Sequence, residues 1–299
     1  MLQELQQSLN DIILGKKEVV RLAVSCMLAH GHLLLEDLPG MGKTTLSHAL
    51  AQLTGMDYCR IQFTSDLLPA DLIGISIFNN QSNTFTFHKG PLFNQLILAD
   101  EINRAPPKTQ SALLEAMEEK QISTDQGTSK LPSPFFVIAT QNPSFHTGTY
   151  PLPESQLDRF LMCLALGYPD REAERKLLKK IEDGPLFLKE KPVMAPNDLL
   201  QLQQQCQQIK VSEVIFDYIQ ALLAASRQQN WFIHGLSPRA GKGLVRASQA
   251  YALTDGRDYV KPDDVIAVAG AVIDHRLQFC QDERKSPSQY LLQHVEVPL

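Results

Sequence analysis

The alternation of apolar and polar positions divides the chain into two regions. Up to about residue 166, short apolar runs alternate with longer amphipathic stretches, a pattern typical of an α/β sheet covered by helices. The pattern therefore predicts an α/β fold with a doubly wound parallel sheet and flanking helices. Five runs have the length and composition of buried strands: HLLLE at 32–36, DYCRIQF at 57–63, NQLILAD at 94–100, FFVIAT at 135–140 and FLMCLAL at 160–166.

Helices and hairpins are expected between these strands. Residues 43–54 and 108–120 space Ala, Leu and Met as on one face of a helix, and the second segment follows two prolines, as helix starts often do. ISIFNNQSNTFTFHKG, residues 75–90, has two strand-like arms around a polar turn and predicts a hairpin. A shorter hairpin is expected over residues 121–131.

The second region is rich in Leu, Ala and Gln at helical spacing and has no strand pattern. We therefore place a domain boundary near Tyr168, with an α/β domain over residues 1–168 and an all-helical domain over 169–299; two domains also fit the chain length. Five helices are predicted, most with Ser, Asp or Asn near the start: 170–183, 195–209, 211–229, 237–256 and 261–277.

Composition and charge narrow the classes of function. The formal net charge of -5 and a pI near 5.9 argue against general electrostatic binding of nucleic acid, although a local basic pore is compatible with them. Five scattered cysteines without a C-x-x-C pair predict free thiols in a reducing compartment. The chain shows no signal-type apolar segment and no apolar run of membrane-spanning length. We expect a cytoplasmic protein without membrane insertion.

The segment EDLPGMGKTT at 36–45 has the features of a phosphate-binding loop between a strand and a helix. Gly40 and Gly42 allow backbone N–H groups to approach phosphates, Lys43 can contact the β and γ oxygens, and the Thr44 hydroxyl can bind Mg²⁺. The helix N-terminus adds partial positive charge. The remaining residues predicted to bind the nucleotide in this loop are Pro39, Met41 and Thr45.

Asp37 departs from the full loop pattern, which has Gly at this position. Glycine there eases the turn out of the strand, whereas the groups that contact phosphate come later in the loop. We expect Glu36 to belong to the strand and Asp37 to turn toward solvent or a loop N–H. Asp37 therefore does not exclude nucleotide binding.

Two further strands end in polar residues that suit ATP chemistry. LILADE at 96–101 delivers two carboxylates at the carboxyl end of a strand, where ligands bind to open parallel sheets. Asp100 can hold Mg²⁺, directly or through water, and Glu101 can activate a water molecule. IATQNP at 138–143 ends in Asn142, which can contact the γ-phosphate or that water if its strand lies between the other two.

Taken together, these motifs resemble those of the AAA+ ATPases, and among them the MoxR family. The resemblance covers nearly the whole chain. MoxR proteins share a phrase that consists of LLLE, then Asp or Gly, then any residue, then PGxGKT. This sequence matches the phrase, with Asp37 at the position that is Asp or Gly. The segments that carry the resemblance are GHLLLEDLPGMGKTTL at 31–46, IQFTSDLLPADLIG at 61–74, GPLFNQLILADEINRAPPKTQSALLEAMEE at 90–119, IATQNP, YPLPESQLDRFLM at 150–162 and LSPRAGKGLVRAS at 236–248.

The resemblance implies a role for each matching residue. Lys43 with Thr44 corresponds to the Walker A pair, Asp100 with Glu101 to the Walker B pair, and Asn142 to sensor 1. ATP and Mg²⁺ are the ligands that these motifs imply.

Residues outside the loop are assigned in the same way. Arg159 in LDRF corresponds to the arginine finger, which reaches into the nucleotide site of a neighbouring subunit. Arg239 in SPRA corresponds to sensor 2, a lid residue that contacts the γ-phosphate of its own subunit's nucleotide. Leu14 and Gly15, in IILGKKEVV, match the segment that lines the adenine pocket.

A finger that acts in a neighbouring subunit implies a homo-oligomer, and the family implies a hexameric ring. The resemblance also implies chaperone-like remodelling of a client such as a von Willebrand factor A domain protein, with the two hairpins as moving client contacts. Three alternatives remain open: a metal-chelatase-like motor subunit, a nucleotide-switched scaffold, and a DNA-acting motor, which the charge disfavours. Intact Glu101 and Arg159 favour hydrolysis over a pure switch.

Overall fold

The computed structural model describes residues 1–80, 83–124, 127–142, 148–179, 191–228, 231–281 and 285–297. Its centre is a five-stranded parallel sheet in the order β2-β5-β8-β1-β9, which confirms the predicted parallel sheet and all five predicted strands. The strand bounds are β1 Leu33–Glu36, β2 Tyr58–Gln62, β5 Leu96–Asp100, β8 Phe136–Gln141 and β9 Met162–Leu164.

The sheet is buried on both faces because successive strand residues point to opposite sides. In β1, Leu33 and Leu35 belong to one hydrophobic cluster, whereas Leu34 belongs to another, and β5 and β8 repeat this alternation. Since neither face is polar, these strands are continuous apolar runs, as expected for a parallel sheet covered by helices.

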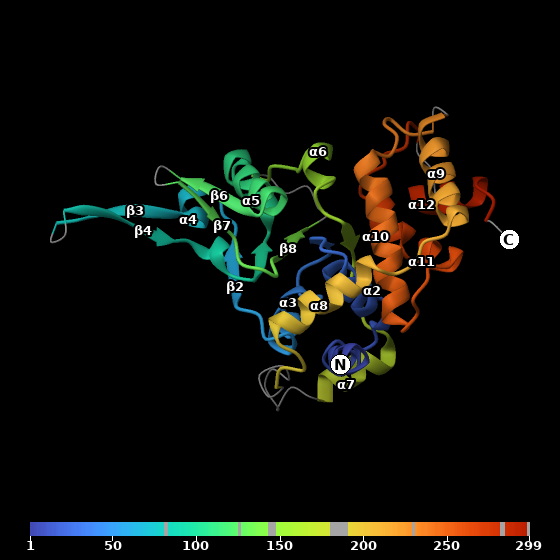
Figure 1. The fold of residues 1–299 in the computed structure, drawn as a ribbon, viewed down its shortest axis with the longest axis horizontal. Helices are drawn as coiled ribbons and strands as arrows, with labels where there is room; N and C mark the ends of the chain where they lie inside the picture. The colour runs from blue at the N-terminus through green and yellow to red at the C-terminus, as the bar shows by residue number, and fades with distance from the viewer. Residues whose placement is uncertain are drawn as a thin grey trace.

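Helices cover the two faces of the sheet (Figure 1). One cluster joins the sheet to α1, α2 and α3 and to the C-terminal helices, and the other joins it to α4 and α5. The helices α1, α2 and α4 and the single turn α6 were not predicted from the sequence. The bounds are α1 Leu2–Ile12, α2 Lys17–Leu28, α3 Lys43–Leu53, α4 Pro69–Ile73, α5 Pro107–Glu119 and α6 Glu154–Leu157.

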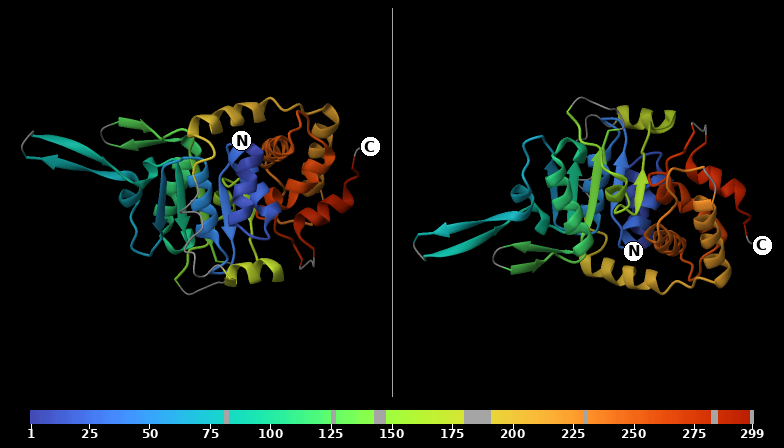
Figure 2. Two further views of the ribbon diagram at one scale, coloured as in Figure 1. Left: turned by 90° about the horizontal axis from the view of Figure 1, so that it is seen from below. Right: turned by 90° about the horizontal axis from the view of Figure 1, so that it is seen from above.

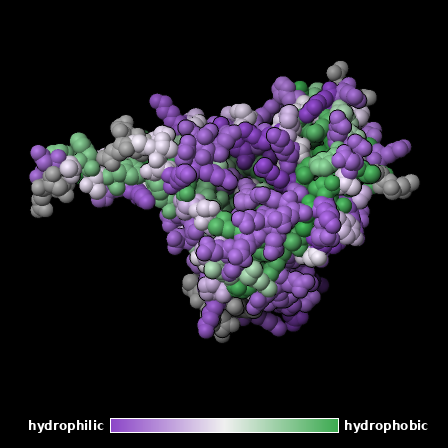
Figure 3. Space-filling model, viewed as in Figure 1, coloured by the Kyte–Doolittle hydropathy of each residue, from purple (hydrophilic) through white to green (hydrophobic). Residues whose placement is uncertain are grey.

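Two antiparallel hairpins confirm the predicted ones. The first pairs β3 (Gly74–Asn79) with β4 (Thr84–Lys89), and the second pairs β6 (Gln121–Thr124) with β7 (Gly127–Lys130). Residues 81–82 and 125–126 lie outside the described residues. Both hairpins extend from the end of the molecule opposite the C-terminal helices (Figure 2). Apolar residues are visible along the longer arm (Figure 3).

The C-terminal region is helical, as predicted, and no described residue after β9 belongs to a named strand. The end of the predicted helix 170–183 lies partly outside the described residues, and α12 was not predicted. No described helix combines the length and apolar character needed to cross a membrane. The helices are α7 Arg171–Lys179, α8 Pro196–Gln207, α9 Glu213–Gln228, α10 Pro238–Thr254, α11 Pro262–Ile273 and α12 Pro287–His294.

Candidate functional site

The predicted phosphate-binding loop connects β1 to α3 at the carboxyl edge of the sheet. Gly40 and Gly42 have φ angles of 81° and 94°, which L side chains rarely adopt. A Cβ at either position would have no neighbour within 4 Å, so the requirement for glycine is conformational rather than steric. Gly42 is the N-cap of α3, so the loop ends at the positive end of an eleven-residue helix.

Lys43 is the first residue of α3, and its ammonium group is turned back into the loop. Nζ donates to the backbone carbonyl of Asp37 at 2.5 Å and of Leu38 at 3.2 Å, and to Asn142 Oδ1 at 3.3 Å. Burial lowers the pKa of Lys43, while the carboxylates of Asp37, Asp100 and Glu101 oppose this. The lysine therefore occupies a pocket of acceptors that a phosphate chain can replace.

Asp37 does not turn toward solvent, which corrects one of the two orientations expected for it. The residue is buried, with 8% of its surface exposed. Its Oδ1 accepts the N–H of Leu38 at 2.8 Å, and its Oδ2 accepts the N–H of Gly167 at 2.6 Å. The second expected orientation, toward a loop N–H, is confirmed. Both oxygens are therefore occupied by backbone donors, which hold the carboxylate in place.

Asp100, the last residue of β5, has both carboxylate oxygens engaged. The hydroxyl of Thr140 in β8 donates to Oδ1 at 2.6 Å. Arg60 in β2 forms an ion pair with Oδ2 at 2.6 Å through one terminal nitrogen, and its Nε donates to the same oxygen at 3.1 Å. Neighbouring strands therefore fix the orientation of this carboxylate.

Glu101 follows Asp100 in the left-handed region, with φ 57° and ψ 51°. A non-glycine residue in this region is uncommon and marks a constrained position, which here is held by the N–H of Glu101 donating to Thr140 Oγ1 at 2.8 Å. Glu101 Oε2 accepts Gln62 Nε2 at 2.9 Å and pairs with Arg104 Nε at 3.0 Å.

Asn142 follows β8, which lies between β1 and β5, so the condition placed on this residue is met. Its Nδ2 donates to Glu101 Oε1 at 3.3 Å, and its Oδ1 accepts from Lys43. The amide thus links the ammonium of the loop to the carboxylate of Glu101. An open cavity of about 360 Å³ lies among these groups, lined by Pro39, Gly40, Gly42, Lys43, Thr44, Thr45, Arg60, Asp100, Glu101 and Asn142.

The cavity fits a triphosphate with a divalent cation. Thr44 and Asp100, the two predicted Mg²⁺ ligands, both line it. Across the described residues, no three His, Cys, Asp or Glu side chains gather as metal ligands, so phosphate oxygens and water would complete the coordination. Because Arg60 occupies Asp100 Oδ2, direct coordination through that oxygen requires Arg60 to move.

Three predicted nucleotide-binding residues do not line this cavity. Met41 packs against the hydrophobic core instead. Leu14 and Gly15 lie between α1 and α2. Gly15 has φ 74°, and a Cβ there would approach Ala173 of α7 to 2.9 Å. This segment therefore faces the start of α7, close to the Gly167 backbone that Asp37 binds.

Arg159 and Arg239 share one carboxylate partner, Glu118, away from the phosphate-binding loop. Glu118 at the end of α5 accepts Arg159 Nε at 3.2 Å on one oxygen and the Arg239 guanidinium on the other. Arg239 also lies 3.8 Å from Asp158, which pairs with Arg276 at 2.8 Å. Both arginines line a second cavity of about 250 Å³, whereas neither lines the first.

Four residues that shape the site were not predicted from the sequence: Arg60, Gln62, Arg104 and Thr140. Two of them carried a usable signal, because Arg60 and Gln62 are polar residues two positions apart in a strand and so point to the same face. Arg104 and Thr140 become recognisable only once the neighbouring strands and the turn after β5 are placed.

Comparison with known proteins identifies the family. Residues 32–162 match the ATPase family associated with various cellular activities (AAA), and residues 224–293 match the AAA lid domain. The Bacillus subtilis protein YeaC is 46% identical, covering 91% of this chain and 85% of its own length. Chaperone MoxR1 of Mycobacterium tuberculosis is 41% identical, covering 91% of this chain and 74% of its own length. A crystal structure from Cytophaga hutchinsonii, of a protein assigned as an ATPase, superposes with a TM-score of 0.90 at 36% identity, covering 99% and 94% of the two chains. The chain therefore belongs to the MoxR family of AAA+ ATPases.

Proposed function

We propose that this protein hydrolyses ATP and uses the energy to remodel partner proteins as a ring. The observation that carries the proposal is the first cavity, where a loop lysine, two strand-end carboxylates and an asparagine converge. This set provides phosphate binding and water activation in one place.

The chain's own groups divide the reaction between them. Lys43 and the loop N–H groups bind the β and γ phosphates, while Asn142 orients the attacking water. Glu101 accepts the proton of that water as its oxygen attacks the γ phosphorus and the bond to ADP breaks. Mg²⁺ held by Thr44 and Asp100 supplies charge neutralisation when bound.

Glu101 is restrained before it can act. Its Oε2 accepts Gln62 Nε2 and pairs with Arg104 Nε, so this carboxylate oxygen is already engaged. Arg60 holds Asp100 in a similar way. We infer that ATP binding exchanges some of these partners, so hydrolysis follows a rearrangement of the cavity.

Arg159 and Arg239 support assembly into a ring. Because they share Glu118 and line a cavity separate from the loop, we propose that both contact the nucleotide of a neighbouring subunit. For Arg239 this replaces the expectation of contact with its own nucleotide. A heterologous contact of this kind forms a ring when the rotation between neighbouring subunits closes, and we propose six subunits for this ring, as the family implies.

The two hairpins are proposed as client contacts. Ile75, Ile77, Phe78 and Phe85 are exposed on the longer hairpin, which extends away from the body of the molecule (Figure 1). A von Willebrand factor A domain protein is one candidate client. The five cysteines are free, which agrees with action in the reducing cytoplasm.

ATP turnover by the purified chain, compared with its Glu101→Gln variant, tests the proposal. We expect the wild type to release phosphate. The variant should still bind ATP, but its rate of ATP hydrolysis should fall by a factor of about 10² to 10⁴. Equal inactivity of both under conditions where rings form would favour a nucleotide-switched scaffold, for which the restrained Glu101 is the supporting observation.

A further inference from the structure

The second cavity carries an excess of positive charge. It lies between the end of α5, the turn at residues 29–32 and one face of α10. Hydrophilic residues surround a hollow in this part of the molecular surface (Figure 3). Among its described lining residues, the charged side chains are the cations Lys120, Arg159, Arg239, Lys242, Arg246 and Arg276 and the carboxylates Glu118 and Asp158.

The geometry of α10 aligns three of these cations. Arg239, Lys242 and Arg246 follow one another at spacings of three and four residues, so they share a helix face over about 10 Å. The floor of the cavity is tightly packed. A Cβ on Gly31 would lie 2.3 Å from the Leu161 side chain, and one on Gly243 would lie 3.1 Å from it. These glycines allow Leu161 to draw α10 against the turn before β1.

The two carboxylates are already used. Glu118 is shared by Arg159 and Arg239, and Asp158 pairs with Arg276, which also donates to backbone carbonyls. Within the described part of the chain, the side chains of Lys120, Lys242 and Arg246 form no ion pair or hydrogen bond.

His30 also lines the cavity, and the positive charge of the cavity affects its protonation. Its pKa is lowered by burial, then by the positive charges of Lys120 and Arg246. Lys120, Lys242 and Arg246 are exposed, so water screens part of their mutual repulsion, and an anion bound among them would reduce it further. They gather in a protein whose net charge is -5.

We propose that Lys120, Lys242 and Arg246 extend the Arg159–Arg239 pair into a binding site for a polyphosphate chain. Each protein chain then has two phosphate sites. One is the loop at the N-terminus of α3, and the other is this cavity, which is lined by cationic side chains. Several cations spread along a helix face match an extended row of phosphate charges better than a single phosphate.

The polyphosphate can come from two sources. One is the triphosphate of a nucleotide bound to a second copy of the chain, and this source rests on the proposed ring function. The other is a free polyphosphate in solution, which would bind whether or not the protein hydrolyses ATP. One experiment tests whether the cavity binds a polyphosphate, and another distinguishes the two sources.

Binding of inorganic tripolyphosphate to a Lys43→Ala chain, measured by calorimetry, tests the site itself because that variant disables the loop. Charge reversal at Lys242→Glu with Arg246→Glu should weaken binding at least about tenfold. A Lys176→Glu, Lys179→Glu chain reverses two exposed cations of α7, so it changes the net charge by the same amount and serves as the control. Tripolyphosphate should also raise the pKa of His30, followed by NMR, in the Lys43→Ala chain but not in the reversed one.

Milder Lys242→Gln and Arg246→Gln substitutions repeat the measurement if charge reversal prevents folding. The proposal would be overturned if the control chain and a chain with either pair of substitutions at Lys242 and Arg246 bound tripolyphosphate equally well, and if tripolyphosphate left the pKa of His30 unchanged. Neither readout depends on ATP turnover, so this failure is distinct from failure of the proposed function.

A mixing experiment identifies the source. A Glu101→Gln chain keeps an intact cavity, and the Lys242→Glu, Arg246→Glu chain keeps an intact Glu101. If the cavity receives a neighbour's nucleotide, each variant alone should lose most of its ATPase activity and a mixture should recover part of it. If the cavity variant alone hydrolyses ATP as fast as wild type, the polyphosphate is free in solution.

Discussion

Asp37 holds the backbone of two segments that lie on either side of the phosphate-binding loop. Its carboxylate accepts N–H groups of Leu38 and Gly167, while its backbone carbonyl accepts Lys43. One residue thus joins the end of β1, the loop lysine and the chain beyond β9. Because these donors fix the carboxylate in place, it would not turn toward a triphosphate bound in the loop.

Replacing Asp37 with glycine separates its structural role from its charge. We expect Asp37→Gly to lower the free energy of unfolding by about 1–3 kcal/mol, because two backbone donors lose their acceptor. ATP affinity should change only a few-fold, since Lys43 contacts the backbone rather than the side chain of residue 37. Chemical denaturation and ATP titration measure the two effects. A large gain in affinity would show that the carboxylate opposes ATP binding.

His32 makes stability depend on pH. Val137 N–H donates to its Nδ1 at 3.0 Å, so Nε2 carries the proton and faces the Met117 carbonyl at 3.3 Å. Burial lowers the pKa of His32 to about 4 from its ordinary 6.5. Between these values the unfolded chain binds a proton that the folded chain does not, so stability falls as pH decreases from 6.5 to 4.

The expected loss over this window is about 3 kcal/mol, at about 1.4 kcal/mol per pH unit. His275 contributes in the same direction, because burial lowers its pKa as well. A His32→Asn chain keeps an acceptor for Val137 but cannot titrate, so its unfolding free energy should vary less with pH. Denaturation curves at pH 7 and pH 4.5 would disprove this if the two chains lost the same stability.

Among the elements, the β3–β4 hairpin is unusual because it exposes large apolar side chains on a two-stranded ribbon. A two-stranded ribbon is marginal by itself, and here Phe78 and Phe85 pair across it with ring centroids 5.1 Å apart. Both rings remain exposed to 44% and 63% of their surface. Apolar side chains held on an extended arm are suited to contact with another molecule rather than to the core.

Alanine at both Phe78 and Phe85 should therefore leave ATP hydrolysis intact but prevent the remodelling of a client protein. We expect the free energy of unfolding to change by no more than about 1 kcal/mol and ATP turnover to stay within twofold, because neither ring touches the nucleotide cavity. Remodelling of a von Willebrand factor A domain partner should be lost. Normal remodelling by this variant would argue against the hairpin as a client contact.

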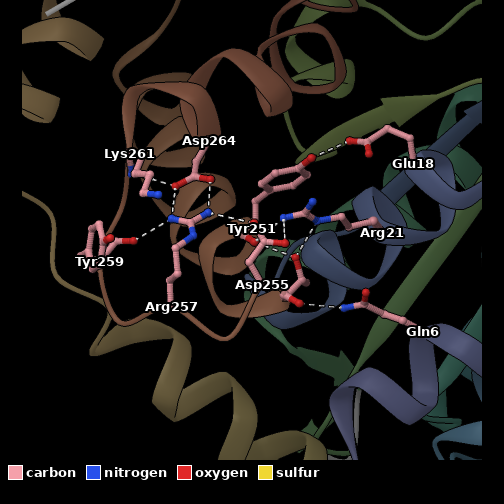
Figure 4. A network of polar contacts seen from close by, with 10 residues as sticks. Gln6, Glu18, Arg21, Tyr251, Asp255, Arg257, Tyr259, Lys261 and Asp264 are labelled. Atoms are coloured by element: carbon pink, nitrogen blue, oxygen red, sulfur yellow. Dashed lines mark hydrogen bonds and ion pairs between the residues drawn. The ribbon is translucent and has the colours of Figure 1, made fainter. Parts of the chain in front are cut away.

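At the scale of the whole molecule, the two predicted domains share one hydrophobic core. A single cluster contains Leu5 of α1, Leu33 of β1 and Leu244 of α10. Polar contacts reinforce it (Figure 4): Arg21 of α2 lies 3.5 Å from the Tyr251 ring centroid and pairs with Asp255, and Tyr251 donates to Glu18. The N-terminal helices therefore fasten the helical region to the sheet.

We expect the chain to unfold in one transition despite its two regions. Trp231, the only tryptophan, packs beside Tyr290 and His294 and reports on the helical region. Its fluorescence should change at the same denaturant concentration as the circular dichroism of the whole chain. An Arg21→Ala chain should unfold earlier by both probes. Two separate midpoints in the wild type would show that the regions unfold independently.

Local signals account for much of what could be predicted. Buried strands are visible as apolar runs, the loop as its glycines and lysine, and the helices α3 and α5 as periodic apolar residues. The helices α1 and α2 escaped prediction, since no motif drew attention to them. Contacts such as those of Arg60 with Asp100 and Gln62 with Glu101 join strands that are distant in sequence, so no local pattern contains them.

The sequence by itself determined the strands, the loop and the identity of the groups that suit ATP chemistry, because these depend on backbone conformation and residue type. Only the tertiary structure decided where the two arginines lie. Glu118 on α5, Arg159 before β9 and Arg239 on α10 are brought together by helix packing around Leu161. The same packing turns Lys242 and Arg246 toward the cavity. Tertiary structure also buries Asp37, because its carboxylate accepts the N–H of Gly167, a residue distant in sequence.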